Sequence, residues 1–368
     1  MSRPIHKIFD PNNLDKFIDS VAEILQIGGA SGSKFFNCVI NGSLYLVKMS
    51  LYTKSYSEEK GIKNEKMSSG FDVEIKLLTL LKDKIINNNL SWCILEILDY
   101  EIYNDITKLV PSTKKCDQLI TQELKMGHHK DIIQNTFCVY KDFIDSGVAY
   151  NKLSFIILET CEMTLYEFLN KYIDTSPMHL EMIKSIIFML IYTVYVIKQV
   201  FPSFYHGDLH LGNVMLIFDP EFKYVPGNPK YIKAWVDNKP HYLPYFGIIV
   251  KIIDFDRASI PDEGIIPFLY DSRISGTFVF KENDFIKLFH SIFIAYPRAS
   301  LDNMLEQLQP NKYYVNYNPD FLRRNASKLF NELQMLKVKL FDDYRLNVAR
   351  DDQIYKEFAN VNDFTKSK

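Results

Sequence analysis

The feature that most constrains this chain is residues 206–213, which read His-Gly-Asp-Leu-His-Leu-Gly-Asn. In this stretch Asp208 lies five residues before Asn213, and a second acidic cluster, Asp-Phe-Asp, begins downstream at Asp254. Together these side chains can hold a nucleophile and one or two metal ions. Transfer of a charged phosphoryl group needs that combination, because there the protein contributes mainly positioning and electrostatic compensation.

The length and composition are typical of a folded protein with one large bilobal unit or two domains. The chain has 368 residues, which suits one large bilobal unit or two domains better than a single core. Hydrophobic residues make up 47% and charged residues 24%, so most of the chain should fold. The net charge of −2 argues against a constitutive nucleic-acid binder, which would usually carry a basic footprint.

The cysteines and the apolar segments favour an intracellular protein. The five cysteines are scattered singly, without a Cys-x-x-Cys pair, which favours reduced thiols. Residues 1–10 are mixed polar and lack the apolar core of a signal peptide. The longest apolar run, 186–197, is too short for a membrane span and fits a buried core helix.

A glycine-rich stretch precedes two strand-like runs near the N-terminus. Gly28, Gly29 and Gly32 come before the runs 35–40 and 43–49, which are separated by Asn-Gly, a strong hairpin signal. The glycines indicate either a plain turn or a loop that covers phosphates. In such a loop the backbone N–H groups approach phosphate oxygens because no side chain intervenes.

A lysine and a glutamate follow this stretch. Lys48, in the second run, is either an exposed edge charge or a point charge for the α/β-phosphates of a nucleotide. Apolar periodicity predicts a helix at 71–84, and Glu74 within it is either solvated or paired with Lys48. Glu65 is the competing partner, and Glu74 is preferred because it lies inside the periodic segment.

The remaining elements are predicted from periodicity and turn signals. Helices are expected at 13–25, 164–172, 178–201, 284–295, 301–308 and 323–341, and strands at 92–103, 155–158, 214–218 and 248–253. Residues 219–247 indicate an insertion, with a hairpin as one form, and 52–70 a connector. Residues 106–152 are hard to assign. Their Gly-His-His at 127–129 favours a loop over a metal site, because no suitable Cys or carboxylate spacing accompanies it.

The order of these features resembles the protein-kinase-like superfamily along residues 25–295. The specific parts are His-Gly-Asp-Leu-His-x-Gly-Asn and Ile-Ile-Asp-Phe-Asp. The resemblance implies an α+β, bilobal protein-kinase-like fold with a β-rich N-lobe and a mainly helical C-lobe. The implied boundaries are 1–158 for the N-lobe, 159–163 for the hinge and 164–368 for the C-lobe, with 219–247 as an insertion.

The resemblance also implies roles for the polar residues. Asp208 would accept or orient the proton of the acceptor hydroxyl. Asn213 and Asp254 would ligate Mg²⁺ ions that bridge the phosphates of ATP, since hard oxygen ligands suit Mg²⁺. Lys48, held by Glu74, would fix the α/β-phosphates.

The same resemblance implies how the rest of the nucleotide would be bound. The glycines of residues 28–32 would cover the phosphates. The backbone of Glu159 and Cys161 would meet the adenine edge, and Leu158 just before them would limit the depth of the pocket. Asp284 would brace the catalytic loop by accepting its backbone N–H groups, unless it is an ordinary N-cap.

Several positions depart from the typical protein-kinase pattern. Gly207 replaces an Arg that normally reads activation-loop phosphorylation, and His210 replaces a Lys that contacts phosphate. Asp-Phe-Asp stands for Asp-Phe-Gly, and no Ala-Pro-Glu motif follows. Haspin-like atypical protein kinases and poxvirus-type virion serine/threonine kinases share such departures. The chain therefore resembles an atypical, constitutively active kinase of the kind that large DNA viruses encode.

The first expectation is thus an ATP- and Mg²⁺-dependent serine/threonine protein kinase acting on a protein substrate. It would need no nucleic acid and would lie in the host cytoplasm, or in the virion if the chain is viral. Small-molecule phosphotransferases of the aminoglycoside/choline type are the alternative, because they share the loop motif. His210 is the residue at which that choice is most open. A non-catalytic pseudokinase scaffold is less favoured, because every key polar residue is present.

Overall fold

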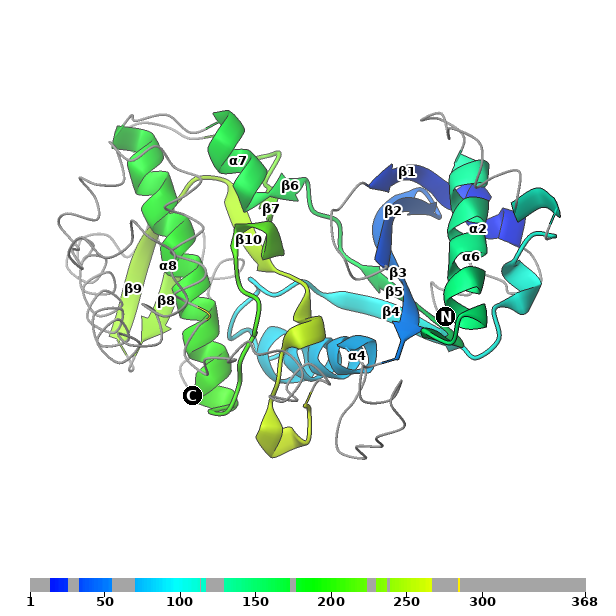
Figure 1. Ribbon diagram of the computed structural model, residues 1–368. Coiled ribbons are helices and arrows are strands. Elements are labelled where there is room, and N and C mark those ends of the chain that lie inside the picture. The colour runs from blue at the N-terminus through cyan, green and yellow to red at the C-terminus, as the bar shows by residue number, and fades with distance from the viewer. Residues whose placement is uncertain are drawn as a thin grey trace, which may run out of the picture. The chain divides into compact units, whose positions relative to one another are not determined.

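The chain forms two compact units, whose elements are drawn in Figure 1. The computed structural model describes residues 14–25, 33–54, 70–112, 114–116, 129–172, 177–223, 230–236, 239–266 and 284. Of these, unit 1 contains residues up to 79, 96–160 and 264–266, and unit 2 contains 80–95, 161–263 and 284. Both helices and sheets are present, so the expected mixed α+β class holds, and unit 1 is rich in β-sheet.

Unit 1 is built on a five-stranded antiparallel sheet with the order β1-β2-β3-β5-β4. Its strands are β1 (Val21–Leu25), β2 (Ser33–Ile40), β3 (Ser43–Thr53), β4 (Ile97–Tyr103) and β5 (Ala149–Leu158). The Asn41-Gly42 turn between β2 and β3 has φ values of 53° and 80°. These left-handed values are what a two-residue hairpin of this type requires, so the predicted hairpin is confirmed.

One face of this sheet is apolar and is covered by two helices, α2 (Leu14–Ser20) and α6 (His129–Asp145), which Figure 1 shows side by side. Phe17 of α2 meets Phe36 and Phe155 edge-on, at 5.3 and 5.4 Å between ring centroids. Because side chains alternate between the two faces of a strand, residues flanking these core positions point to the opposite face. That opposite face carries Lys48.

One local prediction in unit 1 is wrong, and one segment that the sequence left unassigned contains a helix. The helix expected at 13–25 ends at Ser20, and the chain continues as β1, where Val21 lies opposite Cys38. Strand pairing overrides the helical periodicity there, because an available sheet edge satisfies the backbone groups. Helix α6 lies in the segment that the sequence left unassigned. Which of its residues form the buried side becomes apparent only from the apolar sheet face that the helix covers.

The cysteines differ from expectation as well. Cys116 and Cys138 form a disulfide, with their Cα atoms 5.5 Å apart, so the prediction of five reduced thiols is wrong for these two. Cys38, Cys93 and Cys161 are not disulfide-bonded. Burial raises the pKa of the Cys38 thiol to about 12, which makes it a small core residue rather than a nucleophile.

Helix α4 (Gly70–Leu81) confirms the helix predicted at 71–84, and it continues into a single π-helical turn, η1 (Lys82–Ile86). The division between the two units falls within α4, so that residues 80–95 belong with unit 2. The segment expected to be a connector lies largely outside the described residues, as do Glu65 and the predicted helices after residue 284.

Unit 2 contains the long helix α8 (Pro177–Val200) and the shorter α7 (Leu165–Tyr172), close to their predicted bounds. Its sheets are the three-stranded β10-β7-β6 and the hairpin β8-β9. The strands are β6 (Met163–Thr164), β7 (Val214–Phe218), β8 (Lys230–Val236), β9 (Lys239–Tyr245) and β10 (Ile248–Ile252). The hairpin lies within residues 219–247, for which the sequence suggested a hairpin, and Ser185 of α8 donates its hydroxyl to the Pro244 carbonyl at 2.9 Å.

Helix α8 is the core helix of unit 2. Within the part of the chain that the structure describes, it is the one helix long and apolar enough to meet the length and hydropathy criteria for a membrane span. However, 72% of that apolar stretch, within Glu181–Val200, is buried inside the protein. A helix that is apolar all round is expected when protein surrounds it, as Phe188 and Thr193 illustrate by their full burial.

Candidate functional site

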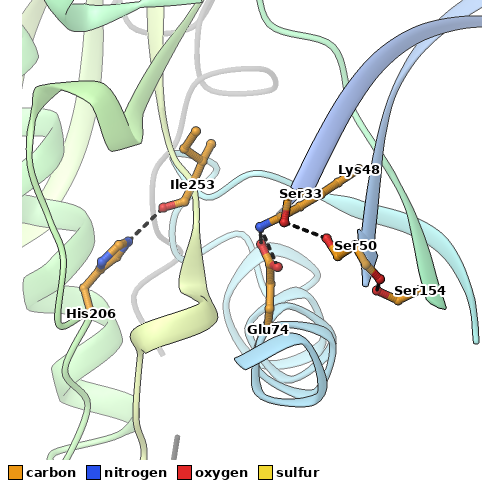
Figure 2. A network of polar contacts seen from close by, with 7 residues as sticks. All are labelled: Ser33, Lys48, Ser50, Glu74, Ser154, His206 and Ile253. Carbon is orange, nitrogen blue, oxygen red and sulfur yellow. Dashed lines mark hydrogen bonds and ion pairs between the residues drawn. The ribbon is translucent and has the colours of Figure 1, made fainter. Parts of the chain in front are cut away.

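Lys48 of β3 is buried and paired with Glu74 of α4, as Figure 2 shows. Its Nζ lies 2.9 Å from Oε1 and 2.8 Å from Oε2 of that carboxylate. Each of the two residues is only 2% exposed. The alternative of an exposed edge lysine is therefore wrong. A buried charge needs such a partner, because removing an isolated ion from water is very costly.

Two neighbouring contacts orient this pair. Phe35 of β2 lies directly opposite Lys48 in the strand register, and its ring centroid is 5.5 Å from Nζ. Tyr52 of β3 donates its hydroxyl to Asp72 Oδ1 at 2.8 Å and so ties the first turn of α4 to the sheet. Burial, with the adjacent Asp72 carboxylate, raises the pKa of Tyr52 and keeps the phenol protonated as the donor.

A row of serines lies beside Lys48 on the same face of the sheet, and the sequence analysis missed it. Ser33 and Ser50 share a hydrogen bond of 2.8 Å between their hydroxyls, and Ser154 donates to the Ser50 carbonyl at 3.4 Å (Figure 2). All three are buried. The sequence signal for it was the alternation of side chains along a strand. Ser50 follows Lys48 by two residues, so the two face the same side of the sheet. The row ties the start of β2 to β3.

Leu158 ends β5 opposite Leu46 of β3 and is 2% exposed. Because Leu46 precedes Lys48 by two residues, Leu158 faces the same side of the sheet as the lysine. Next, Glu159 donates its backbone N–H to the Glu96 carbonyl at 3.2 Å. Its side-chain Oε1 accepts the Glu96 N–H at 2.7 Å. This exchange fixes the chain just before it leaves unit 1.

Cys161 begins the second segment of unit 2, and its side chain is half-buried. An adenine-binding role for Leu158, Glu159 and Cys161 remains a prediction. Gly28, Gly29 and Gly32 lie outside the described residues.

In unit 2 two neighbouring side chains hold the backbone of Asp208, one at its N–H and one at its carbonyl. The Asp208 N–H donates to His206 Nδ1 at 3.3 Å, and the Asp208 carbonyl accepts from Asn213 Nδ2 at 2.9 Å. His206 is buried, and its Nε2 lies 2.9 Å from the Ile253 carbonyl (Figure 2). Since a carbonyl can only accept, Nε2 carries the proton and Nδ1 is left to accept from Asp208.

Asp284 braces the same loop from the far end of the described chain. Its Oδ2 accepts the His206 N–H and its Oδ1 accepts the Gly207 N–H, both at 2.8 Å. Asp284 is 6% exposed. Gly207 has φ of 79°, a value that an Arg or any other larger residue would adopt only with strain. This geometry favours the bracing role of Asp284 over that of an ordinary N-cap.

Asn213 and Asp254 are brought to the same end of the β7-β10 pair. These strands are antiparallel, with Val214 opposite Ile252, and the Ile253 N–H donates to the Asn213 carbonyl at 3.0 Å. Asn213 immediately precedes β7, whereas Asp254 follows β10 closely. The amide nitrogen of Asn213 is already a donor to the loop, so its Oδ1 is the atom suited to ligation.

The donor set fits Mg²⁺ bound together with phosphates. Among the described residues no group of three or more His, Cys, Asp or Glu side chains could hold a metal ion. Mg²⁺ does not require such a cage, because it usually binds one or two carboxylates together with substrate phosphates and water. The oxygens of Asn213 and Asp254 are of that kind.

Asp254 also redirects the chain. It adopts a left-handed conformation, with φ and ψ both 63°, and begins the short 3-10 helix η4 (Phe255–Arg257). Phe255 is fully buried, and its ring centroid is 4.8 Å from that of His206. The apolar middle residue of Asp-Phe-Asp therefore anchors this motif to the loop that carries Asp208.

His210 has a local structural task. Its Nδ1 accepts the Gly212 N–H at 3.0 Å and so caps the 3-10 helix η3 (Leu211–Asn213). A Cβ at Gly212 would lie 2.9 Å from His210 Cε1, which explains a glycine at that position. The imidazole thus orients the turn that leads to Asn213. A catalytic role for His210 remains a prediction.

Arg257 is a further residue of the site, which the sequence alone did not indicate. Its Nη1 lies 3.3 Å from Oδ2 of Asp208. The position directly after Asp-Phe-Asp was the only available signal, because nothing local links residue 257 to residue 208.

The comparisons with known proteins support a kinase-like protein. No family model matches the chain. Two similar proteins, both named as serine/threonine-protein kinases, come from a large DNA virus, Acanthamoeba polyphaga mimivirus. These similarities support a kinase-like protein with a large DNA virus as its source.

The first of these relatives is "Putative serine/threonine-protein kinase R301", 22% identical over 248 residues, or 64% of this chain and 61% of that protein. The second is "Putative serine/threonine-protein kinase R400", 28% identical over 227 residues, or 61% of this chain and 43% of that protein. The chain thus spans about half the length of these relatives.

Proposed function

We propose that this chain is an ATP- and Mg²⁺-dependent serine/threonine protein kinase of the atypical kind that includes haspin-like and poxvirus-type virion kinases. The observation that carries the proposal is the arrangement of the 206–213 loop with Asp254. The Asn213 amide holds the Asp208 backbone, and the oxygens of Asn213 and Asp254 lie at one end of a strand pair. The loop and the strand pair would thus hold a general base, Asp208, together with two metal ligands, Asn213 and Asp254.

The resemblance to protein kinases assigns a chemistry to each residue. Asp208 would take the proton of the attacking hydroxyl as that oxygen bonds to the γ-phosphorus of ATP and the ADP oxygen departs. Bound Mg²⁺ would neutralise charge on the phosphates. Lys48, with Glu74 as its buried partner, would give the α/β-phosphates a fixed positive charge.

Unit 1 would thus correspond to the N-lobe and unit 2 to the C-lobe, with the hinge at 159–163. The names of the two mimivirus relatives support a protein acceptor over a small molecule. We further propose that the kinase is constitutively active and acts in the host cytoplasm or the virion. In support, Asp284 holds Gly207 directly, where an Arg would read a phosphorylated segment.

A transfer assay tests the function. Purified chain is incubated with γ-labelled ATP and Mg²⁺, and is offered casein, histones, aminoglycosides and choline. We expect label on protein serine or threonine, before and after phosphatase treatment. Asp208→Asn should lower kcat at least about a hundredfold, because the general base is lost. The matched control is Asp262→Asn, which removes an exposed carboxylate of unit 2.

Each contrary outcome overturns a specific claim. Label on choline or an aminoglycoside but not on protein would favour the small-molecule phosphotransferase. Unchanged turnover in Asp208→Asn would remove the proposed base. A large drop after phosphatase treatment would contradict constitutive activity, and no transfer to any acceptor would contradict the function as a whole.

A further inference from the structure

Arg257 contacts the carboxylate to which we assign proton transfer. The guanidinium Nη1 lies 3.3 Å from Asp208 Oδ2. The Asp208 side chain is 16% exposed and that of Arg257 49%, so the contact lies at the edge of the protein rather than in its core. An ion pair in that setting contributes little to folding stability. Stability therefore does not account for this contact.

Both ends of this ion pair are anchored on His206. Asp208 donates its backbone N–H to Nδ1 of His206, and the buried ring of Phe255 packs against the imidazole with 4.8 Å between centroids. Phe255 and Arg257 belong to the same single turn, η4. The backbone that carries the cation is therefore held against the loop that carries the carboxylate.

Two hydrogen bonds hold the main chain of Asp208. Its N–H is bound by His206 and its carbonyl by Asn213, but neither bond sets χ1 or χ2. An Asp side chain has three staggered χ1 rotamers and a broad χ2, and a side-chain partner favours one of these orientations. The contact of Arg257 with Oδ2 supplies such a partner, and the charge makes this contact stronger than one with a neutral donor.

We propose that Arg257 is a positioning residue for phosphoryl transfer, holding the Asp208 carboxylate in the orientation that receives the acceptor proton. This inference rests on the proposed function. Arg257 acts through Asp208 and need not touch ATP or the acceptor. Because a misplacement of about 1 Å can cost a hundredfold in rate, loss of the contact should act on turnover.

The test compares three variants of the full chain with the wild type. Arg257→Met removes the charge and keeps an unbranched stem of similar bulk. Arg257→Lys keeps the charge, and the single-nitrogen contact can be made by an ammonium group. Lys184→Met is the matched control, since Lys184 is a partly exposed cation of unit 2 with an ion pair of its own, 2.8 Å to Glu181.

We expect Arg257→Met to lower kcat about 10- to 100-fold with the KM for ATP unchanged. Arg257→Lys should retain most of the turnover, and Lys184→Met all of it. The Tm of each variant should lie within about 3 °C of the wild type, because partly exposed ion pairs contribute little stability. This combination separates positioning from a structural role, which would lower Tm together with turnover.

Three outcomes overturn the inference while the proposed function stands. They are an unchanged kcat in Arg257→Met, an equal loss in Arg257→Lys, and a rise in kcat that would make the contact an inhibitory latch. In all three the wild-type chain phosphorylates protein and Asp208→Asn does not. If the wild-type chain transfers no phosphate, the proposed function fails, and this inference fails with it.

Discussion

Replacing Lys48 by Met should destabilise unit 1 strongly, although it removes a polar group from a buried position. Both partners of the Lys48–Glu74 pair are 2% exposed, and the carboxylate is bound through both oxygens. The variant leaves the Glu74 carboxylate buried without its cation. Breaking a buried pair in this way costs about 3–5 kcal/mol. For a unit of this size the loss corresponds to a Tm lower by roughly 6–20 °C.

Replacing Glu74 by Met as well should reverse the loss of stability caused by Lys48→Met. In the double variant Lys48→Met/Glu74→Met neither of the two positions carries a charge, and apolar residues in place of a buried pair are often neutral or stabilising by about 1–4 kcal/mol. Its stability should therefore return to near the wild-type value. Its use of ATP should not return, because the proposed phosphate-binding charge is still missing.

Differential scanning calorimetry gives the Tm, and amide hydrogen exchange of β3 and α4 gives the local stability of the two elements that carry the pair. Lys34→Met is the control, since Lys34 is an exposed residue of the neighbouring strand β2. If the double variant is as unstable as Lys48→Met alone, the reasoning from uncompensated charge is refuted. If Lys48→Met uses ATP normally, the lysine is only structural.

Two further predictions concern the brace and the disulfide. Asp284→Ala leaves two loop N–H groups without an acceptor, so we expect a loss of about 2–4 kcal/mol in denaturant unfolding and reduced turnover; unchanged values would contradict the bracing role. Cys116 and Cys138 are 22 residues apart, so Ala at both positions, or reduction, should lower stability by about 3 kcal/mol. The reductant should shift the Tm of the wild type but not that of the double variant, and a wild type insensitive to it would argue against the disulfide.

Elements with strong local signals could be predicted from the sequence. The Asn-Gly turn specifies its own left-handed backbone, which sets the β2-β3 hairpin and places Lys48 on a strand. The apolar run of α8 covers residues 186–197, and β7 and β10 are short, mainly apolar runs next to the motifs. In each case the residues that define the element are neighbours in the chain.

Elements that depend on distant partners could not be predicted. Residues 21–25 have helical periodicity, but pairing with β2 makes them a strand. Helix α6 has mixed composition, and its apolar stripe has meaning only against the sheet that it covers. The Cys116–Cys138 disulfide has no spacing motif, so only the fold brings the two sulfurs together.

By itself the sequence determined which chemical groups are present and that several share one loop. Asp208, Asn213 and the residues between them form one short stretch of chain, so their spacing alone constrains their geometry. Only the tertiary structure decided which groups meet across the chain. Glu74 joins Lys48 over 26 residues, and Asp284 joins His206 over 78. Contacts over such separations arise from strand register and packing, which no local pattern encodes.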